Sequence, residues 1–203
     1  MPRTMSDFDS PAASLRWPDV PACYGWLSLD RRGGWRLQGE PVVHRGLVAF
    51  LNAHYGVDDG GAWRVHNGPQ KVFVTLAYTP WVLRLETDGR LTTHTGADAG
   101  RVDAVFIDEE GNLLLHTERG LGLLDDRDLP AVLAQCRVDD GTPADDALTA
   151  LMDGETGSER AAPAVRWRTQ VLQPIRRDEV ARRFGFVPDP ASDTSPPATG
   201  TAP

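Results

Sequence analysis

Apolar and polar residues alternate with a period of two along much of the chain, the pattern of strands buried on one face. In the first such segment Leu27 and Leu29 share a face, although apolar groups also occur on the opposite face. After a turn at residues 30–34, Trp35 and Leu37 alternate with polar neighbours. The two segments together predict a β-hairpin.

Two segments instead repeat their apolar residues every three or four positions, which predicts short amphipathic helices. Gly56 is expected to end the first helix, and Asp126 or Asp128 to cap the start of the second. The two apolar sets are Leu47, Phe50, Leu51 and His54, and Leu129, Val132, Leu133 and Cys136.

A β-meander is predicted between the helices. Asn67–Gly68 and Asp88–Gly89 are turn dipeptides that separate strands. Pro69 lacks a backbone N–H, so the loop that follows Asn67 is expected to be longer than two residues. The predicted strands cover residues 63–66, 72–77, 81–86, 91–94, 102–108, 112–117 and 119–124.

The hairpin and helix patterns occur twice. LSLDRRGGWRLQ aligns with VFIDEEGNLLLH at an offset of 78 residues (108 − 30), and the helices align at 82 (129 − 47). The tetrapeptide VDDG follows each helix, at Val57 and at Val138, with an offset of 81 (138 − 57). We interpret VDDG as the helix exit of a duplicated β-β-α unit, although hairpins and helices in general can imitate such a match. A calcium loop is not predicted, because its ligands alternate over about a dozen residues.

These patterns predict an α+β fold that is antiparallel and β-rich, with two repeated β-β-α units, a meander between them and a short helical C-terminal segment. Residues 21–100 hold the first unit and the meander, and residues 101–187 hold the second unit and an Arg-rich segment. Residues 1–20 and 188–203 are polar and rich in Pro, Ser or Thr, which predicts disorder.

Composition narrows the classes of function. The chain has 203 residues and a net charge of −8, which argues against a nucleic-acid or anionic-membrane surface. It contains neither a run of about 20 apolar residues nor an N-terminal secretory pattern. The two cysteines, Cys23 and Cys136, fit buried apolar positions in a reducing compartment. We therefore expect a cytoplasmic protein with no nucleic-acid or membrane partner.

The Arg-rich segment at residues 166–183 is the exception to the acidic composition. Its arginines interleave with Trp167 and other apolar residues, and Phe184 follows. Such a segment could grip nucleic acid, but it could also dock on the acidic body of its own chain. Because an attached partner has a high effective concentration, we predict docking, with Trp167 and Phe184 at least partly buried.

Sequence motifs for common chemistries are missing. The chain has no phosphate-binding glycine loop, no Cys-x-x-Cys, no His-Glu-x-x-His and no Gly-x-Ser-x-Gly. No cofactor and no metal are therefore predicted. A catalytic site assembled in space from His44, His66, His94 or His116 and an aspartate stays open.

The stretch WRVHNGPQKVFVTLAYTPWVLRL at residues 63–85 resembles the central motif of an uncharacterised bacterial family. Asn-Gly-Pro-Gln and Tyr-Thr-Pro-Trp recur together there, and the resemblance extends over residues 24–85 and an Arg-Phe-Gly-Phe near the end. It implies a family but no reaction. A hairpin with Trp35 and Gly39 before a helix is distantly similar to another uncharacterised bacterial family, which implies repeated β-rich motifs and a signalling role.

The same stretch supplies the candidate binding residues. Amides beside a turn, the only lysine of the chain and a nearby tryptophan and arginine would suit a polar recognition loop with an aromatic floor. The alternative is a specified hairpin turn with the tryptophan in the core. The candidates are Asn67, Gln70, Lys71, Trp81 and Arg84.

Two functions follow from these observations. The first is a non-catalytic module that binds a small molecule or a protein, in signalling or elsewhere, and that can form a homodimer through exposed strand edges. The second is a small-molecule enzyme with a His/Asp site in a pocket between the two repeats. A large pocket with a histidine bonded to a carboxylate would favour the enzyme.

Overall fold

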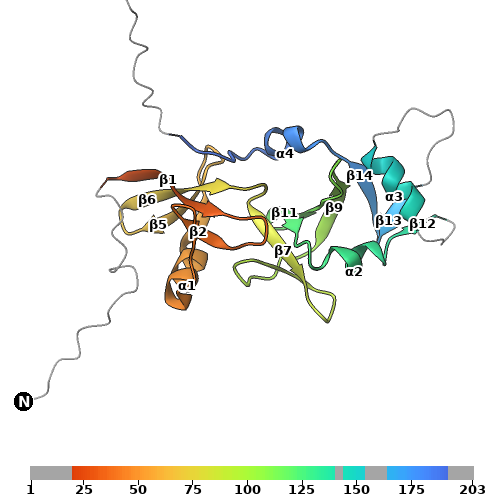
Figure 1. Ribbon diagram of the computed structural model, residues 1–203, viewed down its shortest axis with the longest axis horizontal. Coiled ribbons are helices and arrows are strands. Elements are labelled where there is room, and N and C mark those ends of the chain that lie inside the picture. The colour runs from red at the N-terminus through yellow and green to blue at the C-terminus, as the bar shows by residue number, and fades with distance from the viewer. Residues whose placement is uncertain (1–19, 140–143, 154–163, 192–203) are drawn as a thin grey trace, which may run out of the picture.

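The computed structural model describes residues 20–139, 144–153 and 164–191, which form two mixed β-sheets and four short helices (Figure 1). The first sheet has six strands in the order β3-β2-β1-β6-β5-β4. Its strands are β1 (Ala22–Leu29), β2 (Trp35–Leu37), β3 (Glu40–Pro41), β4 (Tyr55–Val57), β5 (Trp63–Asn67) and β6 (Gln70–Leu76).

The second sheet has eight strands in the order β12-β13-β14-β9-β10-β11-β7-β8. The strands are β7 (Trp81–Leu85), β8 (Leu91–Thr93), β9 (Val102–Ile107), β10 (Leu113–Thr117), β11 (Gly120–Leu124), β12 (Arg137–Val138), β13 (Val165–Trp167) and β14 (Gln170–Pro174). The sheets lie at opposite ends of the long axis of the molecule, and α4 (Arg177–Phe184) lies between them on one side (Figure 1).

The two sheets share one connectivity. Replacing β1 to β6 by β9 to β14, in chain order, turns the strand order of the first sheet into that of six of the eight strands of the second, and β7 and β8 extend the second sheet beyond β11. In both, the first and last strands of the set pair in parallel, and the other neighbours are antiparallel. The hairpin register also repeats, because Leu29 pairs with Trp35 where Ile107 pairs with Leu113.

The expectation of an antiparallel fold is wrong at three strand pairs. β1 pairs with β6, β7 with β11 and β9 with β14 in parallel. The predicted meander is also divided, since β5 and β6 belong to the first sheet and β7 and β8 to the second. Alternation along a strand shows which face is buried, but it does not show which strand lies beside it.

Helix ends differ from the prediction in ways that local contacts explain. Helix α1 (Arg45–His54) leads directly into β4, so Gly56 lies in a strand instead of ending the helix. Asp128 precedes α2 (Leu129–Leu133) but makes no capping hydrogen bond, because its carboxylate accepts from Arg84 and from the Leu85 N–H. A fourth helix, α3, covers Asp145–Met152.

The turn at Gly68–Pro69 is tighter than expected. Asn67 and Gln70 pair directly, so the turn has two residues, and Gly68 adopts a φ of 61°. Pro69 lies in the turn itself, where its missing N–H leaves no gap in the strand pairing. In the first VDDG copy Val57 ends β4, and its aspartates enter the β4–β5 turn. The second VDDG extends beyond the described residues after Asp139.

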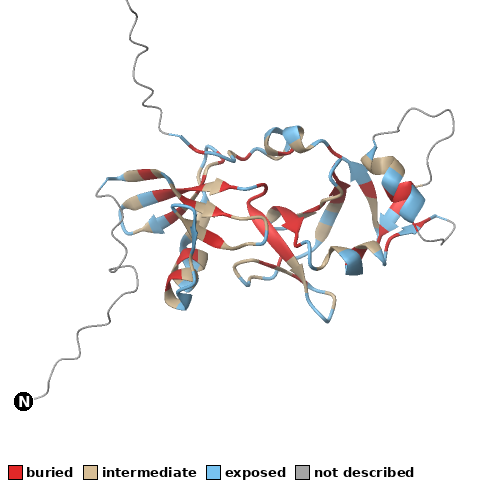
Figure 2. Cartoon of the chain, viewed as in Figure 1, coloured by how far each residue is buried: buried red, intermediate tan, exposed pale blue. Residues whose placement is uncertain are grey.

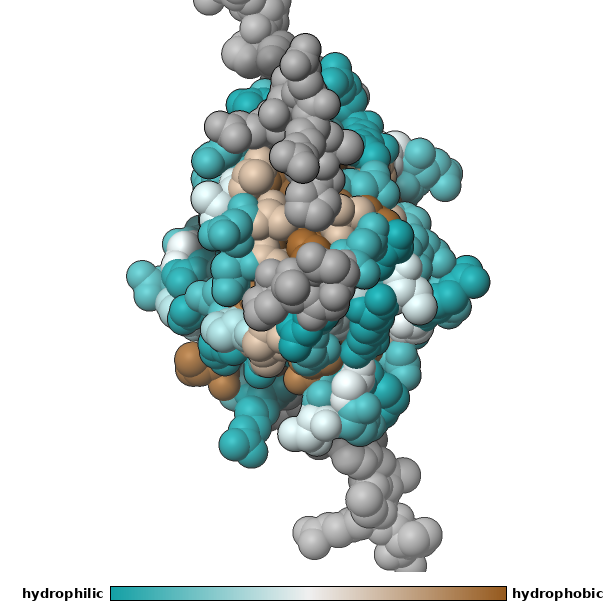
Figure 3. All heavy atoms as spheres, turned by 90° about the vertical axis from the view of Figure 1, so that its right-hand side faces the viewer, coloured by the Kyte–Doolittle hydropathy of each residue, from teal (hydrophilic) through white to brown (hydrophobic). Residues whose placement is uncertain are grey.

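The core runs through both sheets, and buried residues concentrate in their central strands (Figure 2). As predicted, Trp167 is buried, with 0% of its surface exposed, and Phe184 is half-buried. Arg166 pairs with Asp139 at 2.8 Å, so this part of the Arg-rich segment contacts acids of its own chain. Viewed from the end formed by β12, β13 and α3, apolar residues lie at the centre and hydrophilic residues surround them (Figure 3).

We call residues 20–100 the first half of the chain and residues 101–191 the second half. Each half also contacts the sheet that the other half mainly forms. After β6 the chain crosses at residues 77–80, and β7 then pairs with β11. After α4 the chain returns to the first sheet, where the Leu76 N–H donates to the Pro188 carbonyl at 2.7 Å and the Val187 N–H donates to the Gly61 carbonyl at 2.9 Å. Pro190 is buried, so the folded part extends beyond residue 188, where a tail was expected to begin.

Candidate functional site

Two equivalent loops meet where the halves join. One connects β1 to β2 at residues 30–34, and the other connects β9 to β10 at residues 108–112. In the first, Asp30 Oδ1 accepts the Arg32 and Gly34 N–H groups at 2.9 and 2.8 Å. In the second, Asp108 Oδ1 accepts the N–H groups of Glu110 and Asn112 at 2.9 and 2.8 Å. An aspartate that bonds its own turn in this way holds both loops in one conformation.

The residues after each aspartate have opposite charges, Arg31–Arg32 in the first loop and Glu109–Glu110 in the second. Arg31 reaches across to the second loop, where it donates to Asn112 Oδ1 at 2.6 Å and lies 3.4 Å from a Glu110 carboxylate oxygen. Arg31 of the first loop and Glu110 of the second, which have opposite charges, therefore connect the two halves directly.

Tyr78, in the crossing segment, lies beside this contact. Its hydroxyl donates to Asp108 Oδ2 at 2.7 Å, and the Arg31 guanidinium lies 5.4 Å from its ring centroid. Burial and the bond to the Asp108 carboxylate raise the pKa of Tyr78 far above its ordinary value. Tyr78 therefore stays a neutral hydrogen-bond donor that fixes Asp108.

A pocket of about 460 Å³ opens beside the two loops, and we call it the junction pocket. Its apolar residues come from the crossing segment, β10, β11 and α2, and its polar residues come from the two loops and the segment before α2. The apolar set is Ala77, Leu113, Leu123, Leu124 and Leu129, and the polar set is Asp30, Arg31, Arg32, Asn112 and Asp126.

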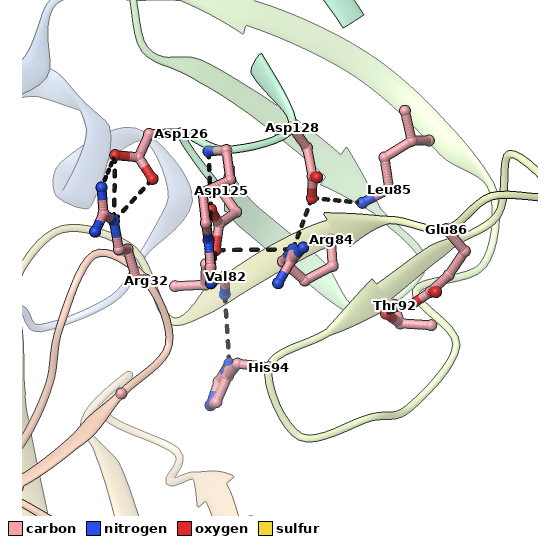
Figure 4. Close-up of polar contacts among 12 residues, drawn as sticks. Arg32, Val82, Arg84, Leu85, Glu86, Thr92, His94, Asp125, Asp126 and Asp128 are labelled. Carbon is pink, nitrogen blue, oxygen red and sulfur yellow. Dashed lines mark hydrogen bonds and ion pairs between the residues drawn. The ribbon is translucent and has the colours of Figure 1, made fainter. Parts of the chain in front are cut away.

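Of the segment Asp125-Asp126-Arg127-Asp128, Asp126 lines the pocket, and Figure 4 shows its contact with Arg32 beside Asp125 and Asp128. Asp125 is fully buried and accepts the Arg127 N–H at 3.0 Å and Arg127 Nε at 2.8 Å. Burial by itself would raise the pKa of Asp125, but the Arg127 bonds outweigh it and lower the pKa. With Asp125 fixed, Asp126 faces the pocket and pairs with Arg32 at 2.6 Å.

His94 lies behind the first loop, outside the residues that line the junction pocket. Its ring contacts Trp35, Tyr55 and Trp81 with centroids 5.4 to 5.6 Å apart, and Nδ1 accepts weakly from the Val82 N–H at 3.4 Å (Figure 4). Nε2 is buried without a partner, and burial lowers the pKa of His94 to about 4. His94 is therefore a neutral structural residue at physiological pH.

The predicted binding residues fall into separate places. Asn67 and Gln70 lie at the β5–β6 turn, where their side chains contact each other and Gln70 donates to the Val20 carbonyl, and Lys71 is exposed beside them. Trp81 lies beyond the opposite end of β6, is 8% exposed and donates to the Arg119 carbonyl. Arg84 pairs with Asp128 at 2.7 Å.

None of the five candidates lines the junction pocket. The polar residues that do line it were missed, although the aligned loops contained a signal for them. DRRG and DEEG occupy equivalent positions, and their opposite charges could have indicated that the two loops interact.

The described residues contain no group of three or more His, Cys, Asp or Glu side chains placed to hold a metal ion. No helix in the described ranges is long and apolar enough to cross a membrane. Across these same ranges no histidine forms a hydrogen bond or an ion pair with a carboxylate.

Residues 7–191 match a family described as "Protein of unknown function (DUF2946)". No curated protein matches the chain. The chain is similar to the solved structure of a DUF1285 family protein from Silicibacter pomeroyi DSS-3, with 16% identity, 59% of this chain and 73% of that chain covered, and a TM-score of 0.46. A DUF1285 family protein from Shewanella baltica OS155 has 16% identity, coverages of 51% and 86%, and a TM-score of 0.36.

Proposed function

The chain belongs to this DUF2946 family of unknown function, and we propose that it acts as a binding module whose junction pocket takes up a small molecule. The pocket supports the proposal because its volume of about 460 Å³ falls in the range of small-molecule sites. An apolar floor with a few polar groups at the rim is also the usual composition of such sites.

Binding is favoured over catalysis by the side chains that line the pocket. They include two aspartates but neither a histidine nor a cysteine. The Asp30 carboxylate already accepts two backbone N–H groups of its own loop, and Asp126 is paired with Arg32. The neutral His94 that would complete a His/Asp site lies outside the lining, so the enzyme alternative has no support at this pocket.

The shared connectivity of the sheets supports a second part of the proposal, that the chain is a duplicated unit. The repeated unit is then larger than β-β-α, because it includes three strands on each side of the helix. The polar surface at Asn67, Gln70 and Lys71, a protein partner, a signalling role and homodimer formation through strand edges stay predictions.

The pocket is tested by filling it. Ala77 is exposed at the pocket and keeps its backbone bond to the Leu29 carbonyl whatever its side chain, so Ala77→Phe should occupy the space without disturbing the core. Ala53, exposed on α1, gives the matched control Ala53→Phe. The probe is N-phenyl-1-naphthylamine, an uncharged apolar fluorophore.

We expect saturable binding of one probe per chain in the wild-type protein and in Ala53→Phe. Binding to Ala77→Phe should be at least tenfold weaker, while its melting temperature stays within a few degrees of the wild-type value. Equal affinity of the two variants for the probe would refute a binding site in the junction pocket.

A further inference from the structure

The rim of the junction pocket has more free donors than free acceptors. Arg31 donates through its two terminal nitrogens, and its Nε donates to no described residue. Arg32 donates through Nε and Nη2, and its Nη1 has no acceptor within the described part of the chain. A guanidinium has five N–H groups in a planar fork, so both arginines keep donors for a further partner.

The acceptors of the rim are already engaged. Asp30 Oδ1 accepts two backbone N–H groups, and Asp30 Oδ2 lies 3.5 Å from the Arg36 guanidinium. Asn112 donates its amide to Asp108 and accepts from Arg31. Both oxygens of Asp126 face Arg32.

The Arg32–Asp126 pair is exchangeable. The two side chains are 62% and 57% exposed, and exposed ion pairs of this kind contribute only about 0–1 kcal/mol. A ligand anion that approaches along the apolar floor would meet Arg32 in a less hydrated setting, where a bidentate contact with a carboxylate or phosphate is stronger. Such an anion can therefore replace Asp126 as the partner of Arg32.

We propose that the ligand of the junction pocket is an amphipathic organic anion, with an aliphatic or aromatic body against Ala77, Leu123 and Leu129 and one carboxylate, phosphate or sulfonate group at Arg31 and Arg32. This inference rests on the proposed function and names the ligand class of the same pocket. Asp126 then acts as an internal competitor that holds Arg32 until the ligand arrives.

The test compares 8-anilinonaphthalene-1-sulfonate with the uncharged N-phenyl-1-naphthylamine. Both have the same ring system, and only the first has an anionic group. Arg32→Gln removes the charge at an exposed position, and Asp126→Asn removes the competitor. Arg45→Gln, at an exposed residue on α1 away from the pocket lining, is the matched control.

We expect Arg32→Gln to weaken binding of the sulfonate about tenfold and to leave binding of the uncharged probe unchanged, as expected for one charge-assisted contact. Asp126→Asn should strengthen sulfonate binding several-fold, and Arg45→Gln should change neither probe. Octanoate should displace the sulfonate, whereas inorganic phosphate at the same concentration should not.

Equal effects of Arg32→Gln on the two probes would overturn the anionic class and leave the pocket itself intact. Displacement by inorganic phosphate as strong as that by octanoate would also overturn it, since it would show an anion site without an apolar part. If Ala77→Phe retains full affinity for both probes, the pocket proposal fails instead, so the two failures are distinguishable.

Discussion

Two features favour glycine at position 33: the left-handed backbone conformation of its loop and the close approach of the His94 side chain. The φ of Gly33 is 77°, and a Cβ at this position would lie 2.4 Å from the Cβ of His94. Gly111, its equivalent in the second loop, has a φ of 80° but would meet only the flexible end of Met152 at 3.1 Å. The pair separates the effect of backbone strain from that of a steric clash.

We therefore expect Gly33→Ala to lower the free energy of unfolding by about 3 kcal/mol and Gly111→Ala by about 1 kcal/mol, since left-handed backbone alone costs roughly 1 kcal/mol. Urea unfolding of both variants measures the difference. Losses of the same size would show that His94 yields easily and that only the backbone matters.

His94 gives the second prediction at this scale. Its pKa is about 4 in the folded chain, against 6.5 for an ordinary imidazole, because burial among aromatic rings disfavours the charged form more than the nearby Asp30 favours it. Between these values the unfolded state binds more protons. The contribution of His94 to the free energy of unfolding is therefore at its maximum above pH 6.5, and it decreases as the pH falls towards 4.

The loss over this range should be on the order of 3 kcal/mol. His94→Phe keeps an aromatic ring and removes the titration, so the stability of the wild-type protein relative to this variant should fall as the pH decreases from 7 to 4. Unfolding titrations at several pH values measure it. Parallel pH profiles for the two proteins would contradict a buried neutral histidine.

Single residues show where sequence reasoning reaches its limit. The aspartate and glycine of each loop could be aligned from the sequence because local backbone geometry requires them. His94 and Trp81 looked like candidates for chemistry, but both are surrounded by aromatic residues from distant segments. Such an enclosure depends on which strands become neighbours, and alternation along one strand does not contain that information.

At the scale of elements, β13 packs into the core through two buried side chains, Val165 and the larger Trp167. Trp167 is fully buried and its Nε1 donates to Gln135 Oε1 at 3.1 Å, while the Arg168 guanidinium lies 4.2 Å from its ring centroid. Trp167→Ala should therefore lower the free energy of unfolding by roughly 3–5 kcal/mol, the range for a large buried aromatic.

Trp26, half-buried on β1, is the matched control. Trp26→Ala should cost less than half as much as Trp167→Ala in the same chemical denaturation experiment. A loss below 1 kcal/mol for Trp167→Ala would mean that β12 and β13 contribute little to the stability of the second sheet.

Most strands between residues 22 and 124 and the helices α1 and α2 were predicted, whereas β3, β4, β12, β13 and β14 were not. The strands at residues 63–67 and 81–124 follow from alternation and turn residues, and α1 and α2 from helical spacing. The parallel pairs β1·β6 and β9·β14 bring together strands that are distant in the chain. The hairpin pairs β1·β2 and β9·β10 could be predicted from the aligned turn residues, but the parallel pairs could not.

For the whole molecule, the mutual contacts between halves predict an asymmetric response to truncation. A chain that ends at residue 191 keeps the contacts of Val187 and Pro188 with Gly61 and Leu76. A chain that ends at residue 185 loses them, together with the buried Phe186 and Pro190. The shorter chain should be several kcal/mol less stable, and the longer one should match the full chain.

Hydrogen exchange locates the effect. In the chain that ends at residue 185 the Leu76 amide, which donates to Pro188, and its neighbours in β6 should exchange much faster, although the removed residues follow the second sheet in sequence. Unchanged protection of β6 would show that the returning segment does not stabilise the first sheet.

The segment after α4 that returns to the first sheet also determines the order in which the two sheets are completed during synthesis. During synthesis the strands of the first sheet leave the ribosome before any part of the second, and N-terminal units generally fold first. Here Gly61 and Leu76 obtain their last backbone partners from Val187 and Pro188, which are translated after the entire second sheet. The sheet that is made first is therefore completed last, and until then its open positions are available to chaperones or to a neighbouring nascent chain.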